Sequence, residues 1–394
     1  MEIDLSRRKF FQLAGIGAGL TVAHPFLPMR MAFADTLENK KLMVVILRGA
    51  MDGLAAVVPY GDKGYAKARG AMALPQNDET LINLDGFFAM HSALKPLAEL
   101  YKKKELLVYH ASATPYRKRS HFDAQDLLEN GTDKPHGISS GWLNRSISSL
   151  SKPLDAIAIG SSVPLALQGN ANVGSWAPSV LPSVDDDFMS RVENMYKSDP
   201  LLLNAFVNAQ EMKDMGGNMQ GAKRGSKAFV GMMKKAAGFM ADDDGANIAT
   251  VEIGGWDTHA NQGLQKGRLA NNFKILAEGI TAFKQDMGEA WKDTAVVTIT
   301  EFGRTVKGNG TGGTDHGTAS VAFLAGGSVN GGKVIGDWPG LNKLYDGRDL
   351  LPVNDLRALL KSLLQQQLSI SKQDLDKAIF PNSRHVWLKD KLFV

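Results

Sequence analysis

Short apolar runs, rich in β-branched residues, recur along the chain and alternate with segments of helical spacing. The runs with the length of a strand buried on both faces lie at 42–47, 106–110, 154–159, 247–253 and 295–300. Between 261 and 291 the apolar residues follow an amphipathic helical period, which would carry the chain from one parallel strand to the next. The pattern predicts an α/β fold with a doubly wound, mostly parallel sheet flanked by helices.

Carboxylate and imidazole side chains come directly after several of these runs. The candidates are Asp52 after the first strand, Asp257 and His259 after the strand at 247–253, Glu301 after the strand at 295–300, and Asp315 and His316 before a further apolar run at 320–324. Ligands of open α/β sheets bind at the carboxyl ends of the strands, so these side chains are candidates for one site. Aspartate, glutamate and histidine together suggest a divalent metal of hard or borderline character.

The sequence around three of these candidates indicates how well each suits the role of a metal ligand. Asp257 and His259 are two residues apart, so in an extended backbone both side chains leave on the same face and can reach one metal ion. Asp52 precedes Gly53, and Asp–Gly is a common turn pair, so this stretch alone leaves a ligand and a turn aspartate as equal alternatives. The repetition of carboxylates at other strand ends favours the ligand.

A helix is expected at 121–129, and its start carries possible chemistry. Ser120 stands three residues before Asp123, as in a capping box, and serine is a preferred N-cap residue whatever a protein does. A hydroxyl at a helix N-terminus also faces free N–H groups and the positive end of the dipole, which suits a nucleophile or an anion-binding group. Arg117 and Arg119 would add charge suited to phosphate-type anions.

The segment 184–245 differs in composition from the rest of the chain. It is rich in Met, Lys and Ala and has helical spacing at 199–212 and 228–240, so it is predicted to be a helical cap inserted into the α/β domain. A last helix is expected at 354–364, with Asn354 as its N-cap.

The N-terminus has the pattern of an export signal. Arg7 and Arg8 precede an apolar stretch at 13–23, and Ala32-Phe33-Ala34 is an A-x-A cleavage signal. We expect residues 1–34 to be a twin-arginine signal peptide and 35–394 to be one mature domain in the periplasm, with the twin-arginine export machinery as a partner. An ordinary basic leader for unfolded export stays an alternative. The apolar stretch is too short for a good membrane span, so no stable membrane anchor is expected.

Composition narrows the remaining function classes. A formal net charge of +4 over 394 residues is slight, and the basic residues are scattered without a recognition motif, so no nucleic-acid partner is expected. The chain has no cysteine, so disulfides cannot stabilise it in an oxidising compartment and it must depend on its core or on a bound metal.

Five ordered segments resemble one known family. They are Arg48-Gly49-Ala50-Met51-Asp52-Gly53, Ser120-His121-Phe122, Gly254-Gly255-Trp256-Asp257-Thr258-His259, Glu301-Phe302-Gly303-Arg304 and Thr314-Asp315-His316-Gly317. The resemblance is to the DUF1501 family, bacterial twin-arginine-exported proteins of unassigned activity that are akin in fold to the alkaline phosphatase and sulfatase superfamily. It implies an alkaline-phosphatase-like fold over nearly the whole mature chain.

The resemblance also implies roles for individual residues. The superfamily's first strand ends in a metal-binding aspartate, which Asp52 matches, and its nucleophile begins the helix after the second strand, where Ser120 lies with His121 beside it. A later Asp and His pair on one metal resembles Asp257 and His259, although the spacing here is shorter. A final metal-binding histidine is matched by His316, with Asp315 as an added candidate.

Two departures from the superfamily's pattern bear on the reaction. Glu301-Phe302 stands where an Asp-His pair on the other metal is expected, so one ligand is missing or replaced and either one or two ions remain. A sulfatase of the usual kind needs a C/S-x-P-x-R motif whose Cys or Ser becomes formylglycine. The chain has neither cysteine nor that motif around Ser120, which disfavours this chemistry.

The leading hypothesis is a metal-dependent hydrolase of a small phosphate or related anionic ester. One or two divalent ions (Zn, Mn or Ca) would bind Asp52, Asp257, His259, Glu301, Asp315 and His316. Catalysis would use Ser120, His121 and Arg304, with Arg117 and Arg119 binding the anion. The alternative is a non-catalytic periplasmic metal-containing binding protein of the same fold. A redox enzyme is a third hypothesis, although no haem, iron–sulfur or molybdenum ligand pattern supports it.

Overall fold

A large sheet forms the centre of the computed structural model, which describes residues 39–394 except 78, 153, 179–185, 201, 204, 205, 208–225 and 389. The described part of the chain contributes nine strands to it. Their order is β11 (Lys333–Ile335), β5 (Leu106–Ala113), β10 (Ser320–Gly326), β9 (Thr294–Thr300), β1 (Lys41–Leu47), β8 (Ile248–Ile253), β6 (Ala156–Ile159) and β7 (Gly174–Trp176), while β12 (Asn354–Asp355) pairs with β5.

Strand β1 lies in the middle of this sheet and is parallel to both neighbours. All seven of its residues are buried, as expected for a run of aliphatic side chains covered on both faces. Leu47 is opposite Ile253 of β8 and Thr300 of β9, so the three strands end at the same level. The segments that follow them therefore leave the sheet side by side.

Strand β10 runs against this direction, because it is antiparallel to both β9 and β5. Ser320, its first residue, is opposite Ser112 near the end of β5. The reversal brings the residues before β10, including Asp315 and His316, to the edge where the parallel strands end. The other strand pairs of this sheet are parallel, as predicted.

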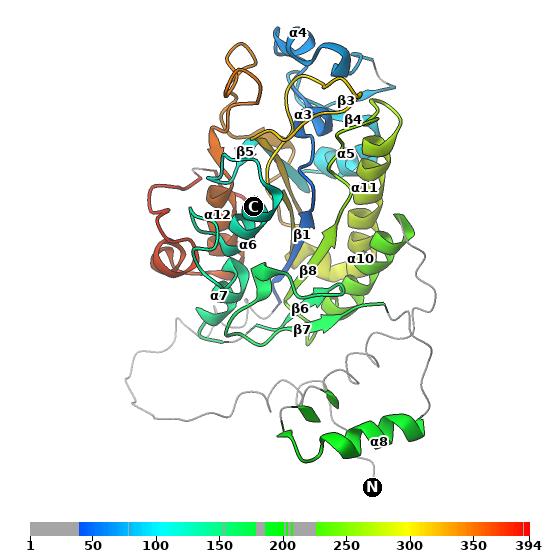
Figure 1. The fold of residues 1–394 in the computed structure, drawn as a ribbon, viewed down its shortest axis with the longest axis vertical. Coiled ribbons are helices and arrows are strands. Elements are labelled where there is room, and N and C mark those ends of the chain that lie inside the picture. The colour runs from blue at the N-terminus through cyan, green and yellow to red at the C-terminus, as the bar shows by residue number, and fades with distance from the viewer. Residues whose placement is uncertain are drawn as a thin grey trace.

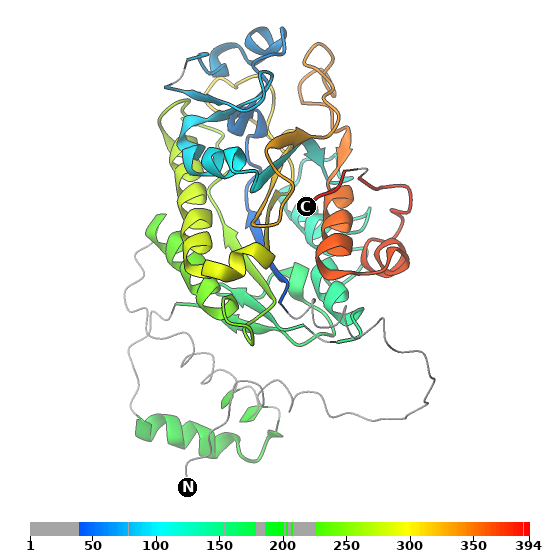
Figure 2. The same cartoon turned by 180° about the vertical axis from the view of Figure 1, so that it is seen from behind.

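Helices cover both faces of the sheet (Figures 1 and 2). One face carries α5 (Lys95–Lys102), α10 (Ser226–Met240) and α11 (Arg268–Met287), and the other carries α6 (His121–Asn130), α7 (Trp142–Ser148) and α12 (Leu356–Leu368). Alternate residues of β1 face the two layers, since Val45 packs in the cluster with α11 and Val44 in the cluster with α12. The predicted doubly wound α/β fold is confirmed.

Smaller elements accompany the main sheet and its helices. They are the helices α3 (Gly53–Ala56), α4 (Tyr65–Arg69), α8 (Asp186–Tyr196) and α13 (Lys372–Asp374), and a second, antiparallel sheet of β2 (Val57–Val58), β4 (Ala89–His91) and β3 (Leu81–Asn83).

Two helix starts differ from the expected positions. Helix α11 begins at Arg268, because Gly263 and Gly267 have φ of +77° and +122° and cannot belong to a right-handed helix. Helix α12 is capped by Asp355, whose carboxylate accepts from the Arg357 backbone N–H at 2.9 Å. Asn354, the predicted cap, instead donates from its amide to the His110 backbone carbonyl at 2.8 Å.

The predicted insertion and signal peptide fall largely outside the described residues. Residues 1–34 and most of 199–212 belong to that part of the chain. The expected helix at 228–240 is present as α10, and it packs closely against α11 through buried residues such as Phe229 and Met233. The cap insertion as a whole stays a prediction. Among the helices of the described residues, none combines the length and apolar character of a membrane span.

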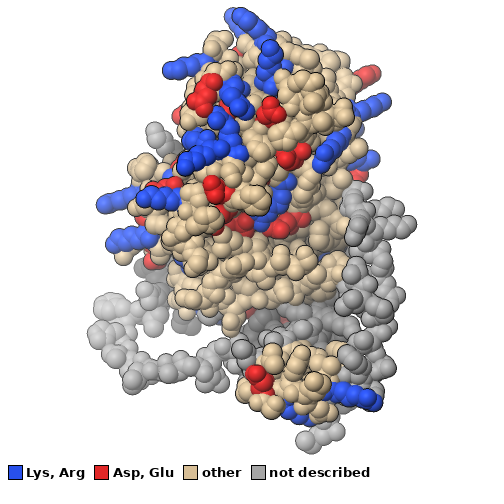
Figure 3. All heavy atoms as spheres, viewed as in Figure 1, with Lys and Arg blue, Asp and Glu red and all other residues tan. Residues whose placement is uncertain are grey.

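Charged side chains of both signs are interspersed on the face shown in Figure 3. This distribution agrees with the small formal net charge of +4. A mixed surface of this kind provides no extended single-sign field over the face that is shown.

The pH dependence of stability can be tested at Asp155, which lies just before β6. Burial raises the pKa of this carboxyl from 3.8 to about 6, and nearby Lys41 opposes the shift. Because the folded state holds this proton more tightly than the unfolded state, ionised Asp155 costs stability as the pH rises from about 4 to 6. We expect Asp155→Asn to gain about 2 kcal/mol relative to wild type between pH 3.5 and 7.

Urea unfolding across this pH range measures the difference. Asp286→Asn, an exposed aspartate on α11, is the matched control and should show no such trend. A constant difference between Asp155→Asn and wild type would contradict the assignment.

Candidate metal centre

The segments after β1, β8 and β9 meet the segment before β10 and the first turn of α6. Gly49, just after β1, donates its backbone N–H to Glu301 Oε1 at 2.8 Å. Its φ is +116°, and a Cβ at this position would lie 2.6 Å from the Asp257 backbone nitrogen. Glycine is therefore required where the loop after β1 approaches the loop after β8.

Four side chains converge at this junction. Ligand atoms of His121, Asp257 and His316 all lie within 4.8 Å of one another. His259 Nε2 is 2.9 Å from His316 Nε2 and 3.0 Å from Asp257 Oδ1. His316 Nε2 is 3.3 Å from Asp257 Oδ1, and His121 Nε2 is 3.6 Å from Asp257 Oδ2. The cluster thus combines three imidazole nitrogens with one carboxylate.

Each of the three imidazoles is held from behind by an oxygen acceptor. His121 Nδ1 lies 2.8 Å from Glu301 Oε1, and His259 Nδ1 lies 3.0 Å from Asp315 Oδ1. His316 Nδ1 lies 2.8 Å from the Arg119 backbone carbonyl. A proton on each Nδ1 satisfies these acceptors and leaves the Nε2 lone pairs facing the cluster, as in metal-bound histidines.

The His121 ring gives an independent sign that the cluster is built for a ligand. Its Nε2 atom is buried and has no hydrogen-bond partner among the described residues. The hydrogen bond from its other ring nitrogen to Glu301 raises the pKa of His121, although burial opposes this. A buried nitrogen without a partner is costly, and a cation at the centre of the cluster would satisfy it.

The spacing of the four side chains fits a metal ion. Ligand atoms bonded at about 2.0 Å to a tetrahedral zinc ion are separated by about 3.3 Å. The three imidazole contacts of Asp257 and the contact between His259 and His316, between 2.9 and 3.6 Å, are close to this separation. The residues present therefore match a divalent cation, with the exposed fractions of Asp257 and His259 (41% and 45%) leaving access for another ligand.

Comparison with known proteins gives the chain a family. A model described as "Protein of unknown function (DUF1501)" matches residues 109–370. The chain belongs to the DUF1501 family. No curated protein matches the sequence of this DUF1501 protein.

Some solved structures resemble the DUF1501 protein at low sequence identity, with TM-scores below 0.5. A putative sulfatase from Bacteroides thetaiotaomicron VPI-5482 has 10% identity and a TM-score of 0.43, covering 89% of this chain and 76% of its own. The C-terminal periplasmic domain of EcEptC from Escherichia coli, in complex with Zn, has 10% identity and a TM-score of 0.41, covering 90% and 92%. TAB5 alkaline phosphatase has 10% identity and a TM-score of 0.34, covering 74% and 91%.

In this DUF1501 protein, Glu301 contacts the cluster through the His121 ring. Its carboxylate is fully buried and accepts hydrogen bonds from the Gly49 N–H, His121 Nδ1, Gln125 Nε2 and the Thr300 hydroxyl. Burial alone would raise the pKa of Glu301, but these donors, led by His121, lower it below its usual value. The structure thus places this predicted ligand behind His121, where it orients the ring.

Asp315 accepts a hydrogen bond from the His259 ring, as Glu301 does from His121, but it lies at the surface. It accepts from His259 Nδ1 and from Asn309 Nδ2, each at 3.0 Å, and its side chain is 51% exposed. The hydrogen bond from Asn309 contributes most to lowering the pKa of Asp315. Of the two adjacent candidates, His316 reaches the cluster and Asp315 binds the ring of His259.

Arg304 contacts the cluster through Asp257. Its guanidinium is fully buried and donates from Nη1 to Asp257 Oδ1 at 2.5 Å, and it also donates to the Thr314 hydroxyl and backbone carbonyl. Burial tends to raise the pKa of Asp257, but the hydrogen bond and charge of Arg304 give a net lowering. The predicted catalytic arginine is therefore bound to Asp257 of the cluster.

Asp52 does not join the cluster. Its carboxylate pairs with Arg69 Nη2 at 2.7 Å, and the two side chains are 1% and 0% exposed. It also accepts from Gln262 Nε2 at 2.9 Å and from the Ala55 N–H at 3.2 Å as the N-cap of α3. Sequence reasoning found this carboxylate but missed Arg69 and Gln262, for which no motif gives a signal.

The two arginines expected to bind the anion are engaged elsewhere. Arg117 Nη1 donates to backbone carbonyls of Thr114 and Tyr116. Arg119 binds the carboxylates of Asp346 and Asp349, at 2.6 and 2.7 Å. Both side chains therefore stabilise surrounding loops in this structure.

Ser120 occupies the N-cap position of α6 but does not form the predicted capping box. Its side chain makes no capping hydrogen bond. Asp123, the expected partner position, accepts instead from the Tyr116 hydroxyl at 2.8 Å. Ser120 lies between Arg119, whose carbonyl holds His316, and His121 of the cluster.

Phe302 stands where the resemblance described above led us to expect a histidine. Its buried ring stacks on His121 with centroids 4.9 Å apart and lies 5.2 Å from the His316 ring. An aromatic ring offers no lone pair to a second ion at this place. Among the described residues one cluster suitable for a metal is found.

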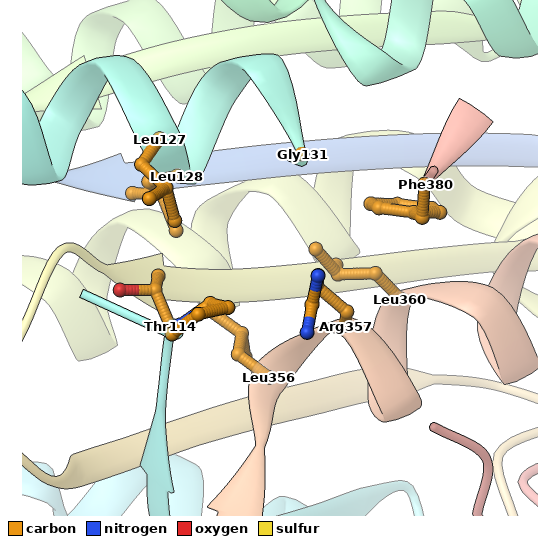
Figure 4. Close-up of a pocket in the computed structure, with 9 residues that line it drawn as sticks. Thr114, Leu127, Leu128, Gly131, Leu356, Arg357, Leu360 and Phe380 are labelled. Carbon is orange, nitrogen blue, oxygen red and sulfur yellow. The ribbon is translucent and has the colours of Figure 1, made fainter. Parts of the chain in front are cut away.

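A separate small cavity lies between α6 and α12 (Figure 4). It is lined mainly by apolar side chains, including Leu127, Leu356 and Phe380, together with Thr114 and Arg357. None of the predicted site residues lines it. The cavity is therefore separate from the predicted site.

The two carboxylates that hold histidine rings should differ in their effect on stability. We expect Glu301→Ala to lower the free energy of unfolding by about 3 kcal/mol, because buried donors lose their acceptor. Asp315→Asn is the matched comparison and should cost less than about 1 kcal/mol, because its carboxylate is half exposed. Urea unfolding in the presence of a chelator measures both. Equal losses in the two variants would contradict the burial-based account.

Proposed function

We propose that this DUF1501 protein is a metal-dependent hydrolase of phosphate or related anionic esters, with Ser120 as its nucleophile. The observation that carries the proposal is the convergence of His121, Asp257 and His316, joined by His259 Nε2 through its contacts with Asp257 and His316, with the Nδ1 atom of each histidine held by an oxygen acceptor. The metal ligands are His121, Asp257, His259 and His316. This set departs from the sequence prediction by including His121 in place of Asp52, Glu301 and Asp315.

The donor set favours zinc. Three imidazole nitrogens and one carboxylate suit a borderline transition ion, whereas calcium takes six to eight oxygen ligands. Phe302, stacked against His121, supports one ion in place of two. When bound, such an ion supplies Lewis acidity that polarises an ester oxygen.

The position of Ser120 supports its role as nucleophile. It begins the ten-residue helix α6, where free N–H groups and the helix dipole favour an anionic group. Its hydroxyl is not used for capping, and it directly precedes the ligand His121. The main chain on both sides of Ser120 is thereby tied to the centre, through the Arg119 carbonyl and the His121 ring.

A non-catalytic metal-containing binding protein is the second candidate. The observation that favours it is that Arg117 and Arg119, expected to bind the anion, and Arg304, expected to act in catalysis, are all bound to protein oxygens. If these contacts persist when a ligand binds, none of the three arginines is free to stabilise the negative charge of a leaving group. Turnover that depends on Ser120 separates the two candidates.

Export to the periplasm belongs to the same proposal. It is supported by Arg7 and Arg8, the apolar stretch after them and the Ala32-Phe33-Ala34 cleavage signal. We propose that the twin-arginine machinery carries the folded protein, so that the ion can be bound before export.

The metal content of the purified protein tests the centre directly. We expect about one equivalent of zinc or another transition ion in wild type, because the four ligands form one site. Elemental analysis should show that Asp257→Ala and His316→Ala lose it. Asp286→Ala, on the exposed face of α11, is the control and should keep the metal. Wild-type protein that binds no divalent metal would exclude the proposal.

Ser120 distinguishes a hydrolase from a binding protein. In a screen of phosphate and sulfate esters we expect Ser120→Ala to lower kcat by at least about 100-fold while metal content stays at the wild-type value, because the nucleophile is lost and the ligands remain. Ser371→Ala, which alters the N-cap serine of α13, is the matched control and should leave turnover unchanged. Turnover that persists in Ser120→Ala would exclude this nucleophile.

A further inference from the structure

Gln262 is a buried side chain whose amide bonds three other polar side chains. It is 0% exposed and follows the loop after β8. Its Nε2 donates to Asp52 Oδ2 at 2.9 Å. Its Oε1 accepts from the hydroxyls of Thr258 and Thr314, at 2.8 and 2.7 Å. Both ends of the amide are therefore engaged inside the protein.

The two threonines stand next to the metal ligands in the chain. Thr258 lies between Asp257 and His259, and Thr314 is followed by Asp315 and His316. Both threonines are fully buried, and the Thr314 N–H donates to the Thr258 carbonyl at 3.1 Å. One amide oxygen thus joins the two loops that supply three of the four converging ligands.

The direction of the Gln262 amide is set by its surroundings. A carboxylate accepts hydrogen bonds, so the NH₂ group must face Asp52 and the carbonyl oxygen must face the two hydroxyls. Arg69, fully buried, pairs with the same Asp52 oxygen at 2.7 Å. The buried ion pair therefore acts as a fixed anchor that selects one orientation of the amide.

A second path leads from this amide to the cluster. Thr314 Oγ1 donates to Gln262 and accepts from Arg304 Nε at 3.2 Å, and Arg304 Nη1 donates to Asp257 Oδ1. The hydroxyl is used as both donor and acceptor, so the bond directions are consistent along the chain. Displacing Gln262 would therefore disturb Asp257 through its own loop and through Arg304.

We propose that Gln262 is a positioning residue that sets the metal affinity of the centre by holding the two ligand loops in register, with the Asp52–Arg69 pair as its anchor. This inference rests on the proposed metal centre. It gives Asp52 a part in metal binding without contact with the ion. Neighbouring groups that orient ligands typically contribute 10- to 100-fold to metal affinity.

The test is zinc affinity of the full chain, measured by competition with a chromogenic chelator. We expect Gln262→Leu to bind zinc about 10- to 100-fold more weakly than wild type while reaching the same stoichiometry at saturation. Gln367→Leu is the matched control, because Gln367 is a buried glutamine that donates to the backbone carbonyls of Lys41 and Asp293. It should lower the stability of the metal-free protein without changing zinc affinity.

A second variant keeps the test decisive if Gln262→Leu folds poorly. Thr258→Val keeps a side chain of similar size and removes one of the two hydroxyls that donate to Gln262 Oε1. We expect Thr258→Val to bind zinc about 10-fold more weakly than wild type at unchanged stoichiometry, in keeping with the usual contribution of groups that orient ligands.

The outcomes separate this inference from the proposed function. Zinc binding within threefold of wild type in Gln262→Leu, or in Thr258→Val if Gln262→Leu does not fold, overturns the positioning role and leaves the metal centre intact. Wild-type protein that binds no zinc overturns both. Loss of zinc affinity in Gln262→Leu, with Gln367→Leu unchanged, supports the role even if no ester is hydrolysed.

Discussion

The parallel pairing of β1 with β8 and β9 is the constraint on which the described centre depends. Leu47, Ile253 and Thr300 are aligned across the three strands, so the loops after them begin at one level. A shift of one residue in any pairing would turn the last side chains to the opposite face of the sheet. The buried, largely apolar strands fix this register. The register in turn determines where the polar side chains that follow the strands lie.

The sequence predicts the parts of this arrangement that depend on local pattern. Apolar runs mark the strands, and Asp257, His259 and His316 follow from their places near strand ends. The direction of β10 does not follow, because a strand covered on both faces has the same apolar pattern in either direction. Its antiparallel course brings His316 to the edge where the parallel strands end.

Carboxylates with the same local signal take different places in the structure because of partners that are distant in the chain. Asp52 and Glu301 both lie just past a strand, as Asp257 does. Asp52 is bound to Arg69, and Glu301 is bound to His121 from α6. Neither partner can be assigned from spacing along the chain, so sequence reasoning identified the carboxylates but not which of them faces the cluster.

Phe302 shields part of the cluster from solvent. Its ring stacks on His121 and packs near His316, whose side chains are 21% and 25% exposed. Asp257 and His259, at 41% and 45%, are the more exposed members of the cluster. A molecule in solution therefore has more contact surface at Asp257 and His259 than at His121, so the replacement of one side chain by an aromatic ring also makes the four members unequal in accessibility.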